Sequence, residues 1–436
     1  MKRKVSEKLL EWKDKKDRKP LILHGARQVG KTYIINEFGR QYFDDVIYIN
    51  FETTQRFTNE FDSDISPDFI INRIELFFEK RIIPGKTLIF FDEIQFCERA
   101  LTSLKYFCEN APEYHIISAG SLLGVALNRE KYSFPVGKVD MLTLFALDFE
   151  EFLWAIGKSQ LSNEIKLCFA ENKPMSEALH QLALELYRTY LIVGGMPAVI
   201  NEYINSNRII ESRNIQNLIL NTYIADMAKY ASPSDTTRIL ACYNSIPTQL
   251  AKENHKFQYK VVQKGGSASL FGTSLDWLLA AGIINKCSKI EHGYMPPSVY
   301  QDLSSFKIYM SDVGLLTLKS GIVPHDIMGE VKSPFIGAIA ENYVANALSS
   351  NGFQLYYWTS KSQAEVDFII QNYDEIIPIE VKANLHVKSR SLSVYSKIYK
   401  TKYSIRISAK NFGFENAIKS IPLYSVFCLK PQTPEL

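Results

Sequence analysis

Residues 25–32 read Gly25-Ala26-Arg27-Gln28-Val29-Gly30-Lys31-Thr32 and match the pattern G-x-x-x-x-G-K-[ST]. The match follows the apolar run Leu21–Leu23 and opens the helical run Tyr33–Ile35, which is the context that this pattern requires. The glycines let the backbone curl so that successive N–H groups point at phosphate oxygens, and the following helix adds the positive end of its dipole. We therefore predict that these eight residues bind nucleotide phosphates, with Lys31 at the β- and γ-phosphates and the Thr32 hydroxyl on Mg²⁺.

Two acidic residues follow a second apolar run. Thr87–Phe91 leads directly into Asp92 and Glu93. A buried strand of a parallel sheet presents such carboxylates at its carboxyl edge, where ligands bind. Asp92 therefore suits the coordination of Mg²⁺, and Glu93 suits the polarisation of an attacking water. Further along, the run Tyr114–Ser118 leads to Ser121, whose hydroxyl is a candidate contact of the γ-phosphate; an ordinary strand-to-loop turn is the alternative.

The first third of the chain alternates short apolar runs with helical patterns. The apolar runs are mostly unalternated, which is typical of a parallel sheet covered on both faces. We predict strands at Leu21–His24, Val46–Phe51, Thr87–Phe91, His115–Ser118 and Val139–Leu144, and helices at Tyr33–Phe38, Asp68–Lys80 and Leu101–Asn110. This order of strands and helices predicts a three-layer α/β domain.

Composition places the chain among ordinary globular proteins, with 46% hydrophobic and 22% charged residues and a formal net charge of +3. Its 436 residues accommodate two to four domains of roughly 100–200 residues each. The six cysteines have no C-x-x-C spacing, so neither a zinc site nor a disulfide framework is indicated. No window has the roughly 18 uninterrupted apolar residues of a membrane span. We expect a cytoplasmic protein that does not enter the membrane.

The middle of the chain is mostly helical. Glu177–Val193 carries apolar residues at helical spacing and ends at a Gly-Gly pair. Between residues 233 and 316, two helical patterns precede a hairpin-like stretch. This order predicts a winged helix, and a helical spacer is the alternative. In a winged helix, four lysines would be candidates for phosphate contacts, although their spacing equally fits a solvated helix face: Lys252, Lys256, Lys260 and Lys264.

The last part of the chain returns to an α/β pattern, in which Val366–Ile370 and Ile376–Lys382 read as a hairpin. Side chains alternate along a strand, so Glu380 and Lys382 share a face. With Asp367 on the same face, two carboxylates and an amine converge. Two carboxylates can hold a divalent cation, and a nearby lysine can position a water or offset charge on a phosphate.

A fourth residue, Glu341, lies on the predicted helix Phe335–Leu348, among small neighbours that let this helix approach the sheet closely. The alternative for the whole set is a half-exposed hairpin that carries Glu and Lys on its solvated face, since such residues are common there.

These motifs together resemble the AAA+ superfamily, and within it a bacterial and archaeal branch in which the ATPase module precedes a domain of uncharacterised function. The resemblance covers essentially the whole chain. It also includes four segments without obvious chemistry: Gly120-Ser121-Leu122-Leu123-Gly124, Phe149-Glu150-Glu151-Phe152, Gly194-Gly195-Met196-Pro197 and Asp312-Val313-Gly314-Leu315-Leu316. Relatives often have Gly-Arg before the last strand, where this chain has Gly137-Lys138. No arginine finger is therefore assigned, and Arg129 is the remaining candidate.

The C-terminal residues resemble the core of PD-(D/E)XK nucleases, which has a helix Glu, a strand Asp and then Glu-x-Lys. The resemblance implies metal ligands at Asp367 and Glu380, Glu341 at or near the metal, and catalytic roles for Asp367, Glu380 and Lys382. The whole chain is thus predicted to contain a P-loop αβα AAA+ domain at 1–160, a helical and winged-helix region at 161–330, and an α/β, restriction-endonuclease-like domain at 331–436.

The predicted function is an Mg²⁺-dependent AAA+ protein that binds and hydrolyses ATP and acts on DNA through its C-terminal domain. The stretch Val381–Lys410 contains eight Lys or Arg and no acid, which fits a DNA-facing surface. The alternative is an ATP-driven conformational switch whose C-terminal domain binds DNA or a protein without cutting it. A metabolic kinase is disfavoured, because nothing indicates an acceptor pocket. ATP, Mg²⁺, DNA and further copies of the chain are the expected partners.

Overall fold

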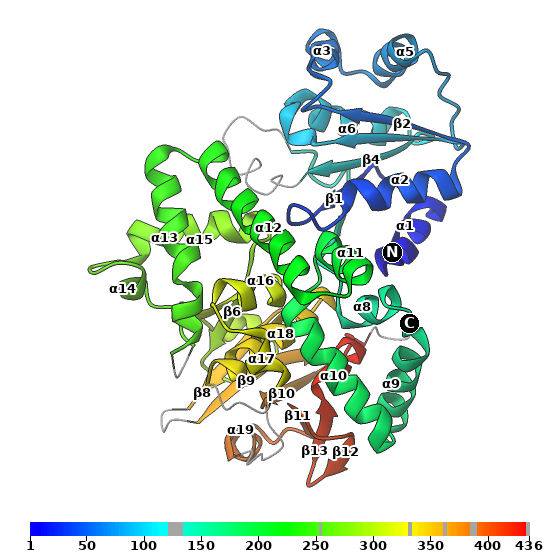
Figure 1. The fold of residues 1–436 in the computed structure, drawn as a ribbon. Coiled ribbons are helices and arrows are strands. Elements are labelled where there is room, and N and C mark those ends of the chain that lie inside the picture. The colour runs from blue at the N-terminus through cyan, green and yellow to red at the C-terminus, as the bar shows by residue number, and fades with distance from the viewer. Residues whose placement is uncertain (121–133, 253–254, 330–333, 361–363, 384–389, 433–436) are drawn as a thin grey trace. The chain divides into compact units, whose positions relative to one another are not determined.

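The computed structural model describes residues 1–120, 134–252, 255–329, 334–360, 364–383 and 390–432. The chain divides into two compact units. The N-terminal unit comprises residues 2–145 with 280–282, and the C-terminal unit comprises residues 146–279 and 283–436 together with Met1. Each unit has its own β-sheet, and Figure 1 shows the elements of both.

The N-terminal unit contains a five-stranded sheet with the order β2-β3-β4-β1-β5, in which all neighbours are parallel. Its strands are β1 (Leu21–His24), β2 (Asp45–Asn50), β3 (Thr87–Asp92), β4 (His115–Gly120) and β5 (Asp140–Thr143). The five strands predicted from the sequence are confirmed, with small differences at their ends. Because the strands are parallel, the loops that follow β1 and β3 leave the same edge of the sheet.

Helices cover both faces of this sheet, so the predicted three-layer αβα arrangement is confirmed (Figure 1). Alternate strand residues such as Ile47, Ile89 and Phe91 join one buried cluster with the helices between β2 and β4. The other face carries the remaining two helices, and Gly39 lets one of them approach Val46 closely. The helices are α1 (Val5–Asp14), α2 (Lys31–Tyr42), α3 (Gln55–Thr58), α4 (Glu60–Ser63), α5 (Pro67–Phe78), α6 (Glu98–Asn110) and the short 3₁₀ helix η1 (Ile94–Phe96).

The C-terminal unit is helical at first. Its helices are α8 (Phe149–Ala155), α9 (Ser159–Glu171), α10 (Glu177–Val193), α11 (Pro197–Ser206), α12 (Ile209–Tyr230), α13 (Pro233–Leu250), α14 (Tyr259–Val262), α15 (Ala268–Ala280), α16 (Val313–Lys319), α17 (Pro324–Met328), α18 (Pro334–Ser350), α19 (Arg390–Tyr399) and the 3₁₀ helices η2 (Pro297–Tyr300) and η3 (Leu423–Cys428). Among the helices that the structure describes, none combines the length and the apolar character needed to cross a membrane.

Two of the segments without obvious chemistry meet in this unit. The buried Asp312 carboxylate accepts hydrogen bonds from the backbone N–H of Gly195, at 2.7 Å, and of Leu315, at 2.8 Å. Asp312 is thereby the N-cap of α16 and also binds the backbone just after α10. A Cβ at Gly195 would lie 2.1 Å from the Leu147 carbonyl oxygen, so only glycine fits this approach. These residues are therefore structural.

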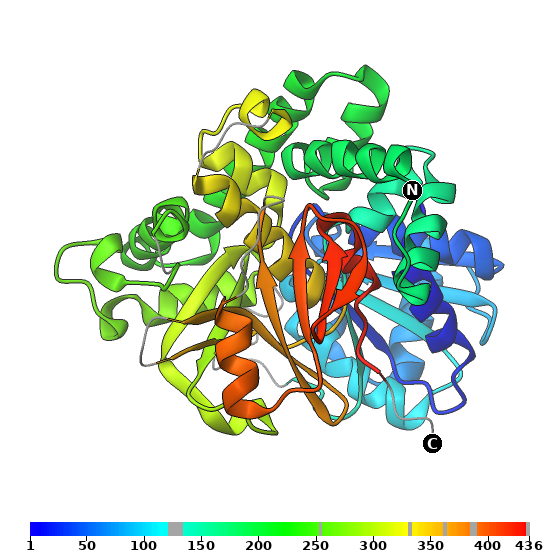
Figure 2. The same ribbon diagram turned by 90° about the horizontal axis from the view of Figure 1, so that it is seen from below.

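The strands of the C-terminal unit form one eight-stranded mixed sheet with the order β12-β13-β11-β10-β9-β8-β6-β7. They are β6 (Ile284–Ile290), β7 (Gln301–Met310), β8 (Tyr356–Thr359), β9 (Glu365–Asn372), β10 (Glu375–Val381), β11 (Ser404–Ser408), β12 (Gly413–Glu415) and β13 (Ile418–Pro422). Helix α19, orange in Figure 2, packs on one face through Leu392 and Tyr395. Helix α18 contributes Glu341 to a cluster with side chains of β7 and β9.

The ribbon predicted as the wing of a winged helix exists as β6 and β7, which pair antiparallel. However, β6 also pairs in parallel with β8, so the ribbon forms one end of the C-terminal sheet. The sheet therefore takes strands from both sides of the domain boundary predicted at residues 330 and 331. The winged helix is not confirmed, and the division into three domains stays a prediction.

The alternative of one solvated helix face for the four middle lysines is wrong. Helix α13 ends at Leu250, before the first of them, and only Lys260 lies in a helix, the short α14. Lys256 instead forms an isolated β-bridge with Lys307. The long helix does not continue through these lysines, because the segment around Lys256 pairs with the sheet.

Candidate functional sites

The loop between β1 and α2 has the backbone geometry that a phosphate-binding loop needs. Gly25 has a φ of +152°, and a Cβ there would lie 2.2 Å from the Leu144 carbonyl oxygen. Gly30 has a φ of 95° and precedes the first residue of α2, and Gln28 also has a positive φ, of 67°. These left-handed residues turn the chain tightly before the helix begins, and the predicted residues from Gly25 to Thr32 all lie on this loop or on the first turn of α2.

Lys31 extends back over this loop. Its Nζ donates hydrogen bonds to the backbone oxygens of Gly25, at 2.8 Å, and Ala26, at 2.9 Å. Burial lowers the pKa of Lys31 to about 8, although the nearby carboxylates of Glu93 and Asp92 act to raise it. The ammonium is thus held by neutral carbonyl oxygens. A phosphate oxygen carries a negative charge that the carbonyl oxygens lack, so a bound phosphate would attract the ammonium more strongly and replace them favourably.

Asp92, at the end of β3, meets the first turn of α2. The Thr32 hydroxyl and the Tyr48 phenol both donate to Asp92 Oδ2, each at 2.9 Å. Burial raises the pKa of the Asp92 carboxyl, whereas the two hydroxyl donors lower it. A hydroxyl and a carboxylate in contact at a sheet edge supply the oxygen ligands that Mg²⁺ prefers. Thr32 and Asp92 therefore fit the predicted ion.

Glu93 follows in a left-handed conformation, with a φ of 51°. Its Oε2 accepts a hydrogen bond from Gln95 Nε2 at 2.5 Å. A non-glycine residue in this conformation is held by its surroundings, and such residues concentrate at functional sites. Sequence reasoning did not single out Gln95 or Tyr48, because a single polar residue next to a strand carries no distinctive pattern.

The C-terminal hairpin brings three of the predicted residues together. Phe368 on β9 pairs with Ile379 on β10, which places Asp367 and Glu380 opposite one another. Asp367 Oδ2 accepts a hydrogen bond from the Val381 N–H at 2.7 Å, and Lys382 Nζ lies 3.2 Å from Glu380 Oε1. Burial, together with the charge of Glu341, raises the pKa of Asp367 to about 7.

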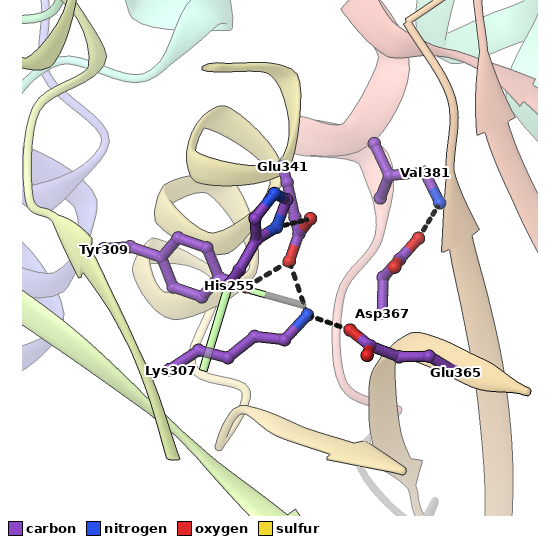
Figure 3. Close-up of polar contacts among 7 residues, drawn as sticks. All are labelled: His255, Lys307, Tyr309, Glu341, Glu365, Asp367 and Val381. Carbon is purple, nitrogen blue, oxygen red and sulfur yellow. Dashed lines mark hydrogen bonds and ion pairs between the residues drawn. The ribbon is translucent and has the colours of Figure 1, made fainter. Parts of the chain in front are cut away.

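The fourth predicted residue, Glu341, is surrounded by hydrogen-bond donors (Figure 3). Its Oε1 accepts from Lys307 Nζ at 2.9 Å and from the Tyr309 hydroxyl at 2.5 Å. His255 Nδ1 lies 2.7 Å from its Oε2. Burial acts to raise the pKa of the Glu341 carboxyl, but Lys307 and His255 dominate and lower it. Glu341 is therefore a carboxylate that protein donors satisfy.

Lys307 connects Glu341 to the neighbouring strands. It is completely buried on β7, and its Nζ also lies 2.6 Å from Glu365 Oε1 on β9. The same Nζ lies 5.1 Å from the centre of the Tyr357 ring on β8. Burial acts to lower the pKa of Lys307, yet the surrounding carboxylates raise it well above its ordinary value, so this lysine is charged.

The arrangement does not fit the metal set predicted from the sequence. Within the part of the chain that the structure describes, no three His, Cys, Asp or Glu side chains are grouped as a metal site. Three donors already occupy the Glu341 carboxylate, and one of them is the ammonium of Lys307. Asp367 and Glu380 remain as a pair, of which Glu380 is 3% exposed.

Sequence reasoning missed Lys307, Tyr309, His255 and Glu365. A signal existed for the first two, since a lysine and a tyrosine two residues apart in the apolar run Ser305–Met310 must share a face. A lysine in such a run needs a buried carboxylate. His255 had no such signal, because the β-bridge between Lys256 and Lys307 brings it into place.

Residues 17–153 match the model of a family described as an AAA domain. Residues 17–153 form an AAA domain. Residues 184–326 and 336–426 match two further models, and each is described as a domain of unknown function. No curated protein matches the chain.

Solved structures that match the chain include a Walker-type ATPase of Pyrococcus abyssi, at 16% identity and a TM-score of 0.44, over 72% of this chain and 94% of that chain. The Orc1 protein of Aeropyrum pernix in complex with DNA follows at 11% identity and a TM-score of 0.29, over 73% of this chain and 90% of that one. The Orc2 protein of the same organism has 10% identity and a TM-score of 0.33, over 74% and 90%. Because these scores are below 0.5, the assignment depends on the family model and on the geometry of the loop.

The structure describes the nucleotide residues predicted from the sequence in the AAA domain, except one. Ser121 and the arginine-finger candidate Arg129 lie outside the described residues. Ser118, buried within β4, is described, and its hydroxyl finds no hydrogen-bond partner among the described residues. Lys138 forms an ion pair with Glu109 at 2.8 Å, on the surface of the domain.

Proposed function

We propose that this chain is an Mg²⁺-dependent ATP hydrolase that acts on DNA through its C-terminal unit. The observation that carries the first part is the contact of the Thr32 hydroxyl with the Asp92 carboxylate, beside a lysine folded over a glycine-turned loop. These are the groups that bind a nucleoside triphosphate and neutralise its phosphate charge in P-loop ATPases.

Each residue of the AAA domain has a separate task in this proposal. Lys31 exchanges its carbonyl partners for β- and γ-phosphate oxygens, and the loop N–H groups orient the phosphates. Thr32 and Asp92 would hold Mg²⁺, which when bound supplies positive charge to the phosphate oxygens. Glu93, fixed by Gln95, orients a water and accepts its proton.

Two variants separate binding from hydrolysis. Lys31→Ala removes charge-assisted hydrogen bonds worth about 3 kcal/mol in total, so ATP should bind roughly 100-fold more weakly. Glu93→Gln should bind ATP normally and hydrolyse it slowly, because an amide cannot accept the proton. Titration with labelled ATP and a phosphate-release assay measure the two effects.

The matched controls are Lys105→Ala and Glu113→Gln, which change exposed residues of the same domain. Both should leave binding and turnover unchanged. Unaltered ATP affinity in Lys31→Ala would remove the basis of the site assignment.

The DNA part of the proposal is supported by charge. Arg390, Lys397 and Lys400 come from the acid-free stretch and are exposed on and directly after α19. Exposed cations on one helix can contact successive phosphates, and each contact contributes about 0.9 to the slope of log affinity against log salt. A triple charge-removal variant should therefore bind DNA more weakly and with a smaller salt slope. An unchanged salt slope would contradict the proposal that these three residues contact DNA.

DNA-dependence of ATP turnover connects the two parts. Stimulation of phosphate release by linear, nicked or branched DNA supports an ATPase that acts on DNA. Failure of all three DNA structures to bind or stimulate would contradict the DNA part and leave the ATPase part intact.

The second candidate function is an ATP-driven switch whose C-terminal unit binds DNA or a protein without cutting it. The saturation of Glu341 by Lys307, Tyr309 and His255 favours this candidate over a metal-dependent nuclease. Cleavage through Asp367, Glu380 and Lys382 stays a prediction. It is tested by incubating purified protein with these DNA structures in Mg²⁺ or Mn²⁺, where cleavage that Asp367→Ala abolishes would favour the nuclease.

A further inference from the structure

Lys307 is more deeply buried than the other lysines that the structure describes. Its side chain has no exposed surface, and it runs beneath α18 from β7 to β9, past the Tyr357 ring. A buried ammonium is costly unless charged partners compensate it. Here two carboxylates do so, Glu341 at 2.9 Å and Glu365 at 2.6 Å.

The same contacts can be described from the side of the carboxylates. Glu341, 5% exposed, could not remain ionised in this position without a cation. In metal-dependent sites, carboxylates on neighbouring elements are brought together by a divalent ion. In this chain the ammonium of Lys307 lies between Glu341 and Glu365, as Figure 3 shows, and a phenol and an imidazole complete the coordination of Glu341.

We propose that Lys307 is the resident cation of the Glu341 cluster, in the role that a divalent metal ion has in similar groups of carboxylates. The cluster consists of Glu341, Glu365, Lys307, Tyr309 and His255. It is then complete without metal, and Glu341 is not a metal ligand. This inference goes beyond ATP hydrolysis and stands or falls independently of it.

The proposal predicts what happens when the ammonium is removed. Lys307→Met keeps most of the length and the apolar stem but leaves Glu341 and Glu365 without their shared cation. The variant should be less stable than the wild type, and a divalent ion that enters the vacated position should stabilise it. Lys286→Met is the matched control, since Lys286 is exposed on the adjacent strand β6.

The experiment measures the thermal unfolding of nucleotide-free full-length protein in EDTA and in increasing Mn²⁺. The wild type and Lys286→Met should show the same response of Tm to Mn²⁺. Lys307→Met should melt lower in EDTA and gain about 5–10 °C at Mn²⁺ concentrations near 100 times Kd. The double variant Lys307→Met/Glu341→Gln should recover part of the lost stability and lose most of the response to Mn²⁺.

A second measurement keeps the proposal testable even if Lys307→Met does not fold. Glu341→Gln leaves Lys307 in place, and Mn²⁺ binding can be followed by electron paramagnetic resonance of the free ion. The proposal expects the same number of bound Mn²⁺ ions in the wild type and in Glu341→Gln. It is overturned if Glu341→Gln loses an ion that the wild type binds, or if a folded Lys307→Met behaves like the Lys286→Met control. Neither result depends on whether the AAA domain hydrolyses ATP.

Discussion

Replacement of Asp312 by alanine should strongly destabilise the C-terminal unit. The carboxylate is 3% exposed and accepts backbone hydrogen bonds from Gly195, at 2.7 Å, and Leu315, at 2.8 Å. In Asp312→Ala both N–H groups are left buried without this acceptor, at about 1–3 kcal/mol each. Burial also raises the pKa of the Asp312 carboxyl, so the wild type already bears a desolvation cost that alanine removes. We therefore expect a loss of about 2–4 kcal/mol, out of a typical total of 5–15.

The segments around Asp312 have little room to rearrange and satisfy the two N–H groups in the variant. A Cβ at Gly194 would lie 2.4 Å from Asp312 Oδ1, and one at Gly314 would lie 2.6 Å from the Gly194 nitrogen, so the two segments are already in close contact. A water that replaced the carboxylate would need room and several polar partners. Asp312→Asn keeps the shape but can accept through one oxygen only, and its loss should be intermediate.

The measurement is urea denaturation followed by hydrogen exchange of peptides from α10 and α16, which reports on this unit alone. The matched control is Ser232→Ala, because Ser232 also caps a helix, α13, through the N–H of Asp235, but at an exposed position. Water can replace that acceptor, so the control should lose only about 0.5–1 kcal/mol. The reasoning is refuted if Asp312→Ala is no less stable than Ser232→Ala.

Three further predictions concern the AAA domain. Gly25→Ala should weaken ATP binding more than tenfold in a titration, since its Cβ would meet the Leu144 oxygen at 2.2 Å. The control Gly85→Ala should bind ATP normally, because its Cβ would have no neighbouring atom within 4 Å. Tyr48→Phe removes a donor that competes for Asp92 Oδ2, so Mg²⁺ should bind the ATP complex about 2–10-fold more tightly in a magnesium titration; weaker binding would contradict this. Burial lowers the pKa of His115 from 6.5 to about 4. Between these two pH values the unfolded chain binds a proton that the native chain does not. The free energy of unfolding should therefore fall on acidification by up to about 1.4 kcal/mol per pH unit. Urea denaturation at pH 7 and pH 5 should show a smaller difference in His115→Phe.

The sheet of the AAA domain could be predicted because its strands are buried on both faces. Runs such as Leu21–His24 and Thr87–Asp92 are mostly apolar and lead into residues predicted to bind the nucleotide and its metal ion. Each of these features is local in the sequence, and the phosphate loop joins one strand to the next helix. Gly25 and Gly30 are required by the backbone itself, so the chemistry and the fold give the same answer.

The C-terminal sheet could be predicted only in part. The hairpin of β9 and β10 is local, and its register follows from the short turn. The parallel pairing of β6 with β8 joins residues far apart in the chain, Ser288 with Tyr356 for example, and hydrophobic periodicity does not specify a partner. The helices before β6 therefore suggested a separate winged helix, although the ribbon belongs to the sheet of the next segment.

The two candidate sites differ in the same way. In the AAA domain, Lys31 is hydrogen-bonded to loop carbonyls and Asp92 to hydroxyls. A nucleotide and its metal ion can replace these partners. In the C-terminal unit, Glu341 is bonded to a buried ammonium from a strand that the motif does not include. A motif records which residues are present but not which charge already balances them. Because an ammonium with no exposed surface cannot leave its carboxylates without unpairing them, the presence of all four nuclease-type residues does not by itself indicate a metal-dependent nuclease.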